Sequence, residues 1–282
     1  MKILTFDIEE WFHILENKST KTTEQWDSFE SRIRLGMDLI YDILEKTEKS
    51  ATFFVVGWIA EKYPEIVNEI NDRGYEIGSH SHLHQLAYEQ DKQTFFNDVE
   101  KSIKTLEDLI GKKVTSFRAP GFSITKKNIW AFEVLHELGI KIDSSVFPAS
   151  RSHGGLPEYS AALPSFINYN GVKLKEFPIN THPFFGRPLI FSGGGYFRLF
   201  PYKIIKNLTL KSDYVMTYFH PRDFDEKQPF VPGLSIPRLF KSYVGIKRCK
   251  SKLEKWLKEF DFVDLNQSDN SINWDKAPVI NL

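Results

Sequence analysis

Short runs of β-branched and aromatic residues alternate with longer amphipathic segments along this chain of 282 residues. About eight of the short runs have the composition of strands. They are Lys2–Phe6, Ala51–Val56, Tyr75–Gly78, Val114–Phe117, Ile140–Ile142, Leu174–Ile179, Tyr214–Phe219 and Phe262–Leu265. Between them, apolar residues recur at helical spacing, notably in Ile59–Ile70 and in Phe95–Ile110, which ends at Gly111. Repeated strand–helix units predict a parallel sheet with right-handed crossovers.

The number of these units decides between two α/β architectures. At this length, about eight strands favour a closed (β/α) barrel. A doubly wound open sheet is the alternative, but it would need a Gly-rich phosphate loop after the first strand, where TFDIEEW stands. Two stretches interrupt the alternation. Ser145–Pro201 is expected to form long loops and extra strands over one end of the barrel, and Pro221–Pro237 is a loop that leads into a basic helix at about Pro237–Phe260.

Charge and apolar patterning exclude several classes of partner. Lys+Arg and Asp+Glu both number 37, so the chain has no broad basic field and no nucleic-acid partner is expected. The longest apolar stretch, Ala51–Ala60, is too short to span a bilayer. The N-terminal MKILTFDIEE turns acidic where a signal peptide would need an apolar core, so we expect a cytoplasmic protein. The single cysteine, Cys249, cannot form an internal disulfide and is expected to be exposed and inert.

Charged and metal-binding residues cluster at the ends of the predicted strands. In a (β/α) barrel, the carboxyl ends of the strands form the working end. These positions hold Asp7 with Glu9 and Glu10, the run His80–His84, Arg118, Asp143 and His220. Solvated loops would scatter Lys and Glu rather than repeat His, Asp and Arg at one strand end after another. The pattern therefore predicts a catalytic site at this end of the barrel.

His80 and His84 lie four residues apart, so on one helical turn both imidazoles would project to the same side and could share a cation. The spacing alone is a weak signal. It gains weight from Asp7 and Glu9, which lie two apart at the end of an extended segment and point to the same side. Two His and one carboxylate, with a position left for water, have the composition of a catalytic zinc-type site. Such a site lowers the pKa of its water to about 7, and a carboxylate outside the metal ligands can act as general base.

The ordered motifs TFDIEEWF, HSHLH, RAPGF, DSS and TYFHP resemble the five motifs of NodB-type polysaccharide deacetylases, carbohydrate esterase family four. The resemblance covers about Lys2 to Pro221 and implies a distorted, incomplete (β/α) barrel. SGGGYFRLFP, together with the stretch from YFHPRDFDEKQP to FKSYVGIKRCKSKLEKWL, looks like the deacetylases of exopolysaccharide loci, which carry an extension after the last motif. Residues 1–282 are therefore expected to form a single domain of this kind, with residues 221–282 as its extension.

The resemblance implies a role for each motif residue. Asp7 would be the general base, and Arg118 would orient it. His220, held by Asp143, would be the general acid that protonates the leaving amine. The backbone N–H of Gly121 would help to stabilise the oxyanion, because a donor aimed at developing charge is worth several kcal/mol.

The metal-binding part of the first motif departs from the usual sequence of the family. The common motif has two adjacent aspartates, whereas here an isoleucine follows Asp7. Glu9 is the expected ligand with His80 and His84, since alternation puts it on the same side as the base. Glu10 is the alternative ligand if the strand ends early. The implied cofactor is a divalent metal ion, with Zn²⁺ as the first candidate.

Residues at the rim bear on the substrate. Tyr196 and Arg198 follow a triple glycine, which is expected to serve a tight turn or a close backbone approach. The segment Phe184–Arg187 repeats the combination of aromatic side chains and arginine. An aromatic face beside an arginine suits a sugar ring next to an anionic group, so Tyr196 and Arg198 are predicted substrate contacts. Arg222 and Asp223 stand where the exopolysaccharide subset usually has Trp-Glu.

Three functions compete. The leading hypothesis is a metal-dependent hydrolase that removes an N-acetyl group from an amino sugar of a surface polysaccharide or of its intracellular precursor, which could be nucleotide- or lipid-linked. The second is a hydrolase of the same fold that acts on a non-sugar C–N bond, such as that of a cyclic amide or formamide. The third is a non-catalytic carbohydrate-binding relative. It is disfavoured because a binding module has no need of the proton-transfer set Asp7, Arg118, Asp143 and His220.

Overall fold

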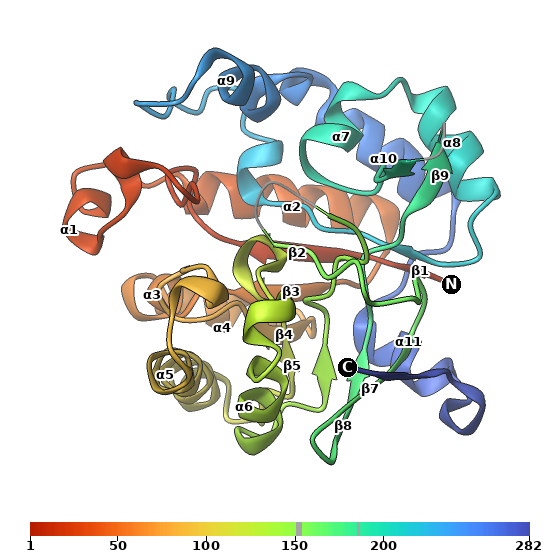
Figure 1. Cartoon of the computed structure of the whole chain (residues 1–282). Coiled ribbons are helices and arrows are strands. Elements are labelled where there is room, and N and C mark those ends of the chain that lie inside the picture. The colour runs from red at the N-terminus through yellow and green to blue at the C-terminus, as the bar shows by residue number, and fades with distance from the viewer. Residues whose placement is uncertain (151–153, 185–186) are drawn as a thin grey trace.

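The computed structural model describes residues 1–150, 154–184 and 187–282 and shows an α/β fold built on a mostly parallel sheet (Figure 1). Within these residues, the largest sheet has eight strands in the order β12-β7-β8-β6-β5-β4-β3-β2. Its neighbouring strands are parallel except in the hairpin β7-β8. The strands are β2 (Thr5–Ile8), β3 (Thr52–Val55), β4 (Glu76–Ser79), β5 (Ser116–Phe117), β6 (Ile142–Asp143), β7 (Ser165–Tyr169), β8 (Val172–Glu176) and β12 (Val279–Asn281).

The sheet curls into a barrel that is not closed by a continuous ladder. The short strand β1 (Lys2–Ile3) pairs in parallel with β11 (Val215–Met216), and Phe6 bridges to Phe219. At the seam between β11 and the segment that follows β8, the backbone N–H of Met216 donates to the side-chain oxygen of Asn180 at 2.9 Å. A side chain thus spans the seam where a strand ladder would otherwise run. The α/β fold class predicted from the alternation is confirmed.

Strands β2 and β3 are buried along their whole length because both of their faces are covered. All residues of β2 and β3 are buried, including Phe6, Phe53 and Phe54. Strands packed on both sides lose the usual alternation of polar and apolar residues. Asp7 is the charged residue of β2, and it is buried near the carboxyl end of the strand.

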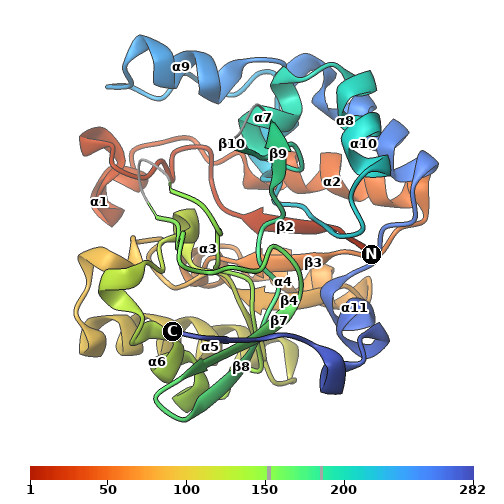
Figure 2. The same cartoon turned by 45° about the vertical axis from the view of Figure 1, so that its right-hand side comes forward.

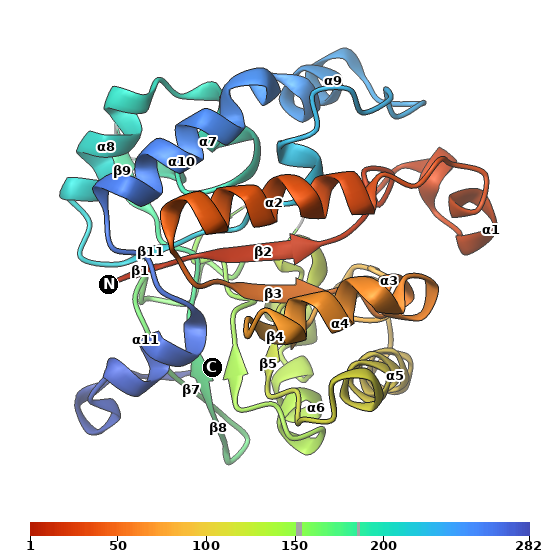
Figure 3. The same cartoon turned by 180° about the vertical axis from the view of Figure 1, so that it is seen from behind.

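Helices cover the outer face of this sheet, and α2 and α10 lie side by side behind β2 (Figure 3). The predicted helix at Phe95–Ile110 is confirmed and ends at Gly111, whose φ of +65° is the left-handed conformation that favours glycine. The predicted segment Ile59–Ile70 is instead two helices, because Pro64 starts a new one. The helices in this half are α1 (Thr23–Trp26), α2 (Ile33–Thr47), α3 (Gly57–Lys62), α4 (Pro64–Asp72), α5 (Lys92–Ile110) and α6 (Ala131–Glu137).

The second half of the chain adds a cap of helices at one side of the barrel, with α9 at its outer edge (Figure 2). Extra strands occur within Ser145–Pro201 as expected, and the strand predicted at Phe262–Leu265 is reduced to a single bridge at Val263. Among the described helices, none has both the length and the apolarity needed to span a bilayer. These elements are β9 (His182–Phe184), β10 (Arg187–Leu189), α7 (Gly194–Leu199), α8 (Tyr202–Leu210), α9 (Ile236–Tyr243), α10 (Cys249–Glu259) and α11 (Leu265–Ser271).

The basic helix predicted at about Pro237–Phe260 is broken into α9 and α10 at Gly245. This residue has a φ of +72°, and a Cβ there would lie 2.3 Å from the carbonyl oxygen of Arg198. The break brings the backbone of the extension directly against α7. The expectation of an exposed thiol is wrong, because Cys249 is fully buried and burial raises its pKa well above the usual value.

Candidate active site

The strand ends converge on one cavity of about 840 Å³. This volume is in the range of small-molecule sites. Six of the residues predicted at or just after strand ends line it, namely Asp7, Glu9, His80, His84, Gly121 and His220. They come from β2 and from the segments that follow β2, β4, β5 and β11, so the parallel register of the sheet is what gathers them at one end.

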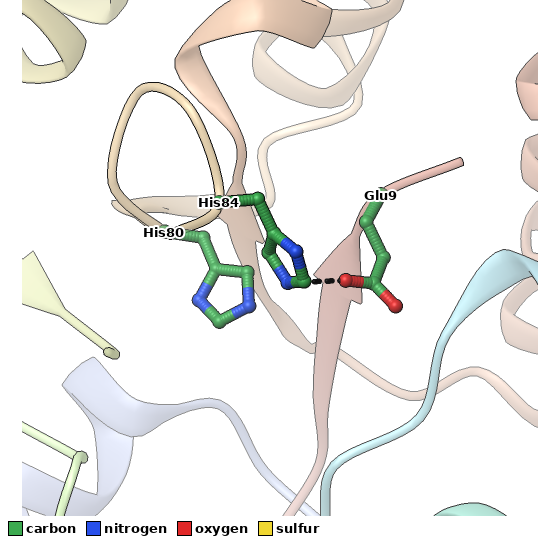
Figure 4. A group of neighbouring side chains, drawn as sticks. All are labelled: Glu9, His80 and His84. Carbon is green, nitrogen blue, oxygen red and sulfur yellow. Dashed lines mark ion pairs between the residues drawn. The ribbon is translucent and has the colours of Figure 1, made fainter. Parts of the chain in front are cut away.

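Glu9, His80 and His84 form a group of buried metal-binding side chains (Figure 4). One potential ligand atom from each lies within 4.8 Å of the others. His80 Nδ1 lies 2.7 Å from the carbonyl oxygen of Arg118, an interaction that makes Nδ1 the donor and leaves Nε2 free to bind a cation. The Nε2 atom of His84 lies 2.5 Å from Glu9 Oε2. The donor set therefore fits a divalent ion with two imidazoles and one carboxylate.

The protonation of this group also suits a cation. Burial lowers the pKa of His80 to about 4, which keeps its imidazole neutral at pH 7. Burial alone would raise the pKa of Glu9, but the neighbouring His84 and His220 outweigh it and hold that pKa well below its usual value. A neutral imidazole and an ionised carboxylate are the forms that bind metal.

His80 and His84 do not lie on a helical turn, and this part of the prediction is wrong. Ser81 and His84 both have positive φ, at +62° and +50°, so the segment is a tight loop. The carboxylate of Asp98 on α5 holds this loop by accepting the backbone N–H of His82 at 2.8 Å, and Ser81 Oγ accepts that of His84 at 3.1 Å. The loop brings the two imidazoles together with ring centroids 5.2 Å apart.

Glu10, the alternative ligand, is committed elsewhere. Its carboxylate accepts hydrogen bonds from the Ser31 hydroxyl and from the backbone N–H groups of Arg32 and Ile33, at 3.1 and 3.2 Å. These donors belong to the first turn of α2, so Glu10 caps that helix. Among the described residues, the metal-binding group contains Glu9 and excludes Glu10.

Asp7 is held by Arg118, which is completely buried. The Nη1 group of Arg118 donates to Asp7 Oδ1 and to Thr5 Oγ1, both at 2.7 Å. The second oxygen, Asp7 Oδ2, faces the cavity and lies 3.9 Å from Nε2 of His220. Arg118 is thus placed to orient the carboxylate while leaving one oxygen open.

His220 is held by Asp223, and the predicted partner Asp143 does not contact it. The Nδ1 atom of His220 lies 3.0 Å from Asp223 Oδ2, within the one-turn helix Pro221–Asp223 that follows the motif. Asp223 is in turn paired with Arg198, whose Nε lies 3.2 Å from its other oxygen. Burial lowers the pKa of His220, but Glu9, Asp223 and Asp7 outweigh it and raise the pKa to about 9.

Asp143 belongs to a separate buried network behind the cavity. Its Oδ1 accepts the Ser145 hydroxyl at 2.5 Å, and within the described part of the chain its other side-chain neighbour is Glu176. Burial raises the pKa of both carboxyls, and their mutual repulsion raises that of Glu176 further. Both raised pKa values mean that the pair holds a proton more tightly than exposed carboxyls do. Ser145 also accepts the backbone N–H of Ala119 at 2.8 Å, so this network supports the loop that carries Gly121.

Arg198 lines the cavity, and its role as a substrate contact stays a prediction, although its terminal Nη groups are engaged by the protein. Its Nη1 and Nη2 groups donate to the carbonyl oxygens of Ser242 and Lys241, at 2.7 and 2.9 Å. Tyr196 lines the same cavity and remains 43% exposed, which leaves its ring accessible. Part of the segment Phe184–Arg187 lies outside the described residues.

Sequence reasoning missed three residues of this cavity. Asp223 could have been found from its i+3 spacing to His220, which places both side chains on one face of a helical turn. Arg222 was noted only as a departure from a family pattern. His13 also lines the cavity, with its ring stacked 5.7 Å from that of His84, and only its place in the run Trp11–His13 could have indicated this.

Comparison with known proteins agrees with this geometry. Residues 26–142 match the polysaccharide deacetylase family. Over these residues the chain is similar to a polysaccharide deacetylase domain. Residues 144–269 match a domain of unknown function, DUF3473, which begins well before the extension expected at residue 221. The likeness to the exopolysaccharide-locus subset stays a prediction.

Individual relatives support the same family. A peptidoglycan-N-acetylglucosamine deacetylase of Bacillus cereus is 33% identical over 95 residues, which is 33% of this chain and 34% of the relative. The chain therefore spans about a third of the length of that relative. A crystal structure from Mycobacterium smegmatis, assigned to the polysaccharide deacetylases, is 18% identical with a TM-score of 0.66 and covers 99% of this chain and 92% of its own. This likeness confirms the distorted (β/α) barrel.

A second structural neighbour is not an active enzyme. It is a pseudoenzyme of carbohydrate esterase family four from Bacillus anthracis, with a TM-score of 0.50 and 11% identity over 94% of this chain and 64% of its own. The fold therefore does not by itself establish activity. The residues of the cavity must carry the functional argument.

Proposed function

We propose that the deacetylase domain is a metal-dependent hydrolase that removes the N-acetyl group of an amino sugar in a surface polysaccharide or its precursor. One observation carries this proposal. Two proton-transfer pairs, Asp7 with Arg118 and His220 with Asp223, open into the same cavity as the metal-binding group. A base and an acid that both reach a Lewis-acid position are what amide hydrolysis needs.

The roles follow from which atoms face the cavity. A divalent ion held by Glu9, His80 and His84 would lower the pKa of water and polarise the acetyl carbonyl. Asp7, oriented by Arg118, takes the proton of the attacking water as the new C–O bond forms. His220 then delivers a proton from Nε2 to the nitrogen as the C–N bond breaks, so that the amine and acetate leave.

The electrostatics of His220 suit this role. Asp223 fixes the orientation of the ring through Nδ1, and the surrounding carboxylates keep the imidazole protonated at neutral pH, with a pKa of about 9. An acid must hold its proton until the leaving amine needs it. The name of the Bacillus cereus relative supports an N-acetylated amino sugar as the substrate class.

Acetate release is the measurement that tests the proposal. The purified protein would be stripped with a chelator, reloaded with Zn²⁺ and incubated with an N-acetylglucosamine tetramer, a muramic-acid disaccharide or UDP-N-acetylglucosamine. We expect acetate from at least one amino sugar, lost after chelation and restored by the ion. Opening of a cyclic amide without any acetate release would favour the second hydrolase hypothesis. No reaction with any of these compounds would place the chain with the pseudoenzymes.

A further inference from the structure

Arg222 is a buried cation at the wall of the candidate active site. It lies in the one-turn helix Pro221–Asp223, is only 8% exposed and lines the same cavity as Asp7 and His220. Its position two residues after His220 limits the distance between their Cα atoms to about 7.6 Å. A sugar ring can therefore approach the catalytic residues and the Arg222 guanidinium together.

The guanidinium of Arg222 forms no direct ion pair with a carboxylate in the described part of the chain. Within those residues, its buried Nη2 atom has no hydrogen-bond acceptor. Its recorded contact is with the ring of Tyr243, whose centroid lies 5.7 Å away. Burial lowers the pKa of the Arg222 guanidinium, and the charge of Arg198 lowers it further, against the opposing effect of Asp223 and Glu9. A buried, unpaired guanidinium is costly, so its retention at a cavity wall points to a ligand.

Nearby carboxylates are already matched to other donors. Asp223 binds His220 and Arg198. Asp225 pairs with Arg32 through two contacts, the longer of 3.0 Å. Glu10 caps α2, and Glu9 belongs to the metal-binding group. Of the buried cations around this cavity, Arg222 is therefore the one whose charge the described residues leave unmatched.

We propose that Arg222 binds an anionic group of the substrate, a carboxylate or a phosphate, beside the acetamido group that is hydrolysed. This inference rests on the proposed N-deacetylase function and narrows its substrate class to acidic or phosphate-bearing amino sugars. The planar guanidinium offers parallel donors that match both kinds of oxyanion. It is better placed for this role than Arg198, whose charge is paired with Asp223 and whose Nη groups donate to two carbonyls.

The competing role is structural. A small void of about 10 Å³ lies between Arg222, Glu10 and Asp225. It has the size of a single water site, through which Arg222 would join those carboxylates. In that case Arg222 would stabilise the fold and would not distinguish charged from neutral substrates. The two roles therefore predict different selectivity.

Binding without turnover separates these roles. In an Asp7→Asn background loaded with Zn²⁺, the affinities of three probes would be measured by calorimetry: a neutral N-acetylglucosamine tetramer, a carboxylate-bearing muramic-acid disaccharide and UDP-N-acetylglucosamine. We expect Arg222→Gln to weaken at least one anionic probe about 10- to 100-fold more than the neutral probe. Arg222→Lys should recover part of the lost affinity, because lysine keeps the positive charge but lacks the paired N–H donors of the guanidinium. Comparing the losses of affinity for the two anionic probes shows whether Arg222 binds a carboxylate or a phosphate.

Arg248→Gln is the matched control, since Arg248 is exposed on the same extension and does not line the cavity. It should change no probe by more than about 2-fold. Zinc content and melting temperature verify that each variant is folded and loaded. An equal loss for neutral and anionic probes, or no loss at all in Arg222→Gln, would overturn the inference. If anionic probes bound in a way that depended on Arg222 but the unmutated enzyme released no acetate, the proposed function would be wrong and the inference on anion binding would stand.

Discussion

At the scale of single residues, two adjacent glutamates have different partners. Glu9 joins His80 and His84, whereas Glu10 caps α2. We therefore expect Glu9→Ala to lose most bound Zn²⁺ in elemental analysis with little change in melting temperature of the metal-free protein. Glu10→Ala should retain the metal but lose about 1–2 kcal/mol of stability, as a lost helix cap does. Loss of metal in Glu10→Ala and not in Glu9→Ala would reverse the assignment.

Asp223 controls the acid in the same local way. The acid must be protonated, and Asp223 is among the carboxylates that raise the pKa of His220 to about 9. Asp223→Asn should therefore move the basic limb of the kcat/KM profile to lower pH by about one unit. Asp143→Asn is the control, because Asp143 has Ser145 and Glu176 as its neighbours. If the basic limb of the pH profile moved in Asp143→Asn and not in Asp223→Asn, Asp143 would be the partner of His220, as the sequence predicted.

The sequence could predict the metal-binding residues and the base because strand ends in a parallel barrel meet at one place. Asp7, Glu9, His80 and His84 all lie at such ends, and their gathering depends only on register. The partner of His220 could not be predicted so simply. The choice between Asp143 and Asp223 depends on side-chain directions within a few ångströms, which strand order does not specify.

At the scale of elements, the break between α9 and α10 positions the acid from a distance. Gly245 lies against the carbonyl of Arg198, and Arg198 binds Asp223. Gly245→Ala would place a Cβ 2.3 Å from that oxygen in a left-handed backbone conformation, which alone costs about 1–2 kcal/mol. We expect lower stability in urea denaturation together with a fall in kcat, whereas Gly171→Ala, with open space around its Cβ, should lower stability alone.

Element boundaries were harder to predict than element types. Amphipathic spacing identified the long helix at Phe95–Ile110, but it could not show that Pro64 and Gly245 divide two other helical segments. Both sides of each break keep helical periodicity, so only backbone geometry reveals it. Strand β12 was missed because it is three residues long and lies at the sheet edge, where little burial constrains its sequence.

At the scale of the whole molecule, the two halves of the chain share one sheet and one cavity, and Asp7 and Glu9 precede the segment 26–142 that matches the deacetylase family. Strands β7, β8 and β12 from residues 144–282 extend the sheet that β2 to β6 begin. His220, Arg222 and Asp223 come from the second half, whereas the metal-binding group comes from the first. The first half alone would therefore lack the proposed acid His220, which the region matched to a domain of unknown function supplies.

The buried carboxyl pair where β6 lies beside β8 should also make the stability of the molecule depend on pH. Asp143 and Glu176 are fully buried there, and burial raises both pKa values. A raised pKa in the folded state means that the proton stabilises the fold below the unfolded value of 4.5 for Glu176. That stability is lost as the pH rises toward the folded value. Each proton involved contributes a slope of about 1.4 kcal/mol per pH unit in this window.

Glu176→Gln replaces the protonated carboxyl by an amide that can donate to Asp143 at every pH. The free energy of unfolding from urea titrations at pH 6 and pH 9 should therefore fall less with pH in Glu176→Gln than in the unmutated chain. Glu89→Gln is the matched control, because Glu89 is exposed and should leave the slope unchanged. Parallel slopes for Glu176→Gln and the unmutated protein would mean that the buried pair carries no proton. Since Val146 binds Glu176 and Ser145 binds Asp143, the loss of that proton would first loosen the wall of the barrel behind the cavity.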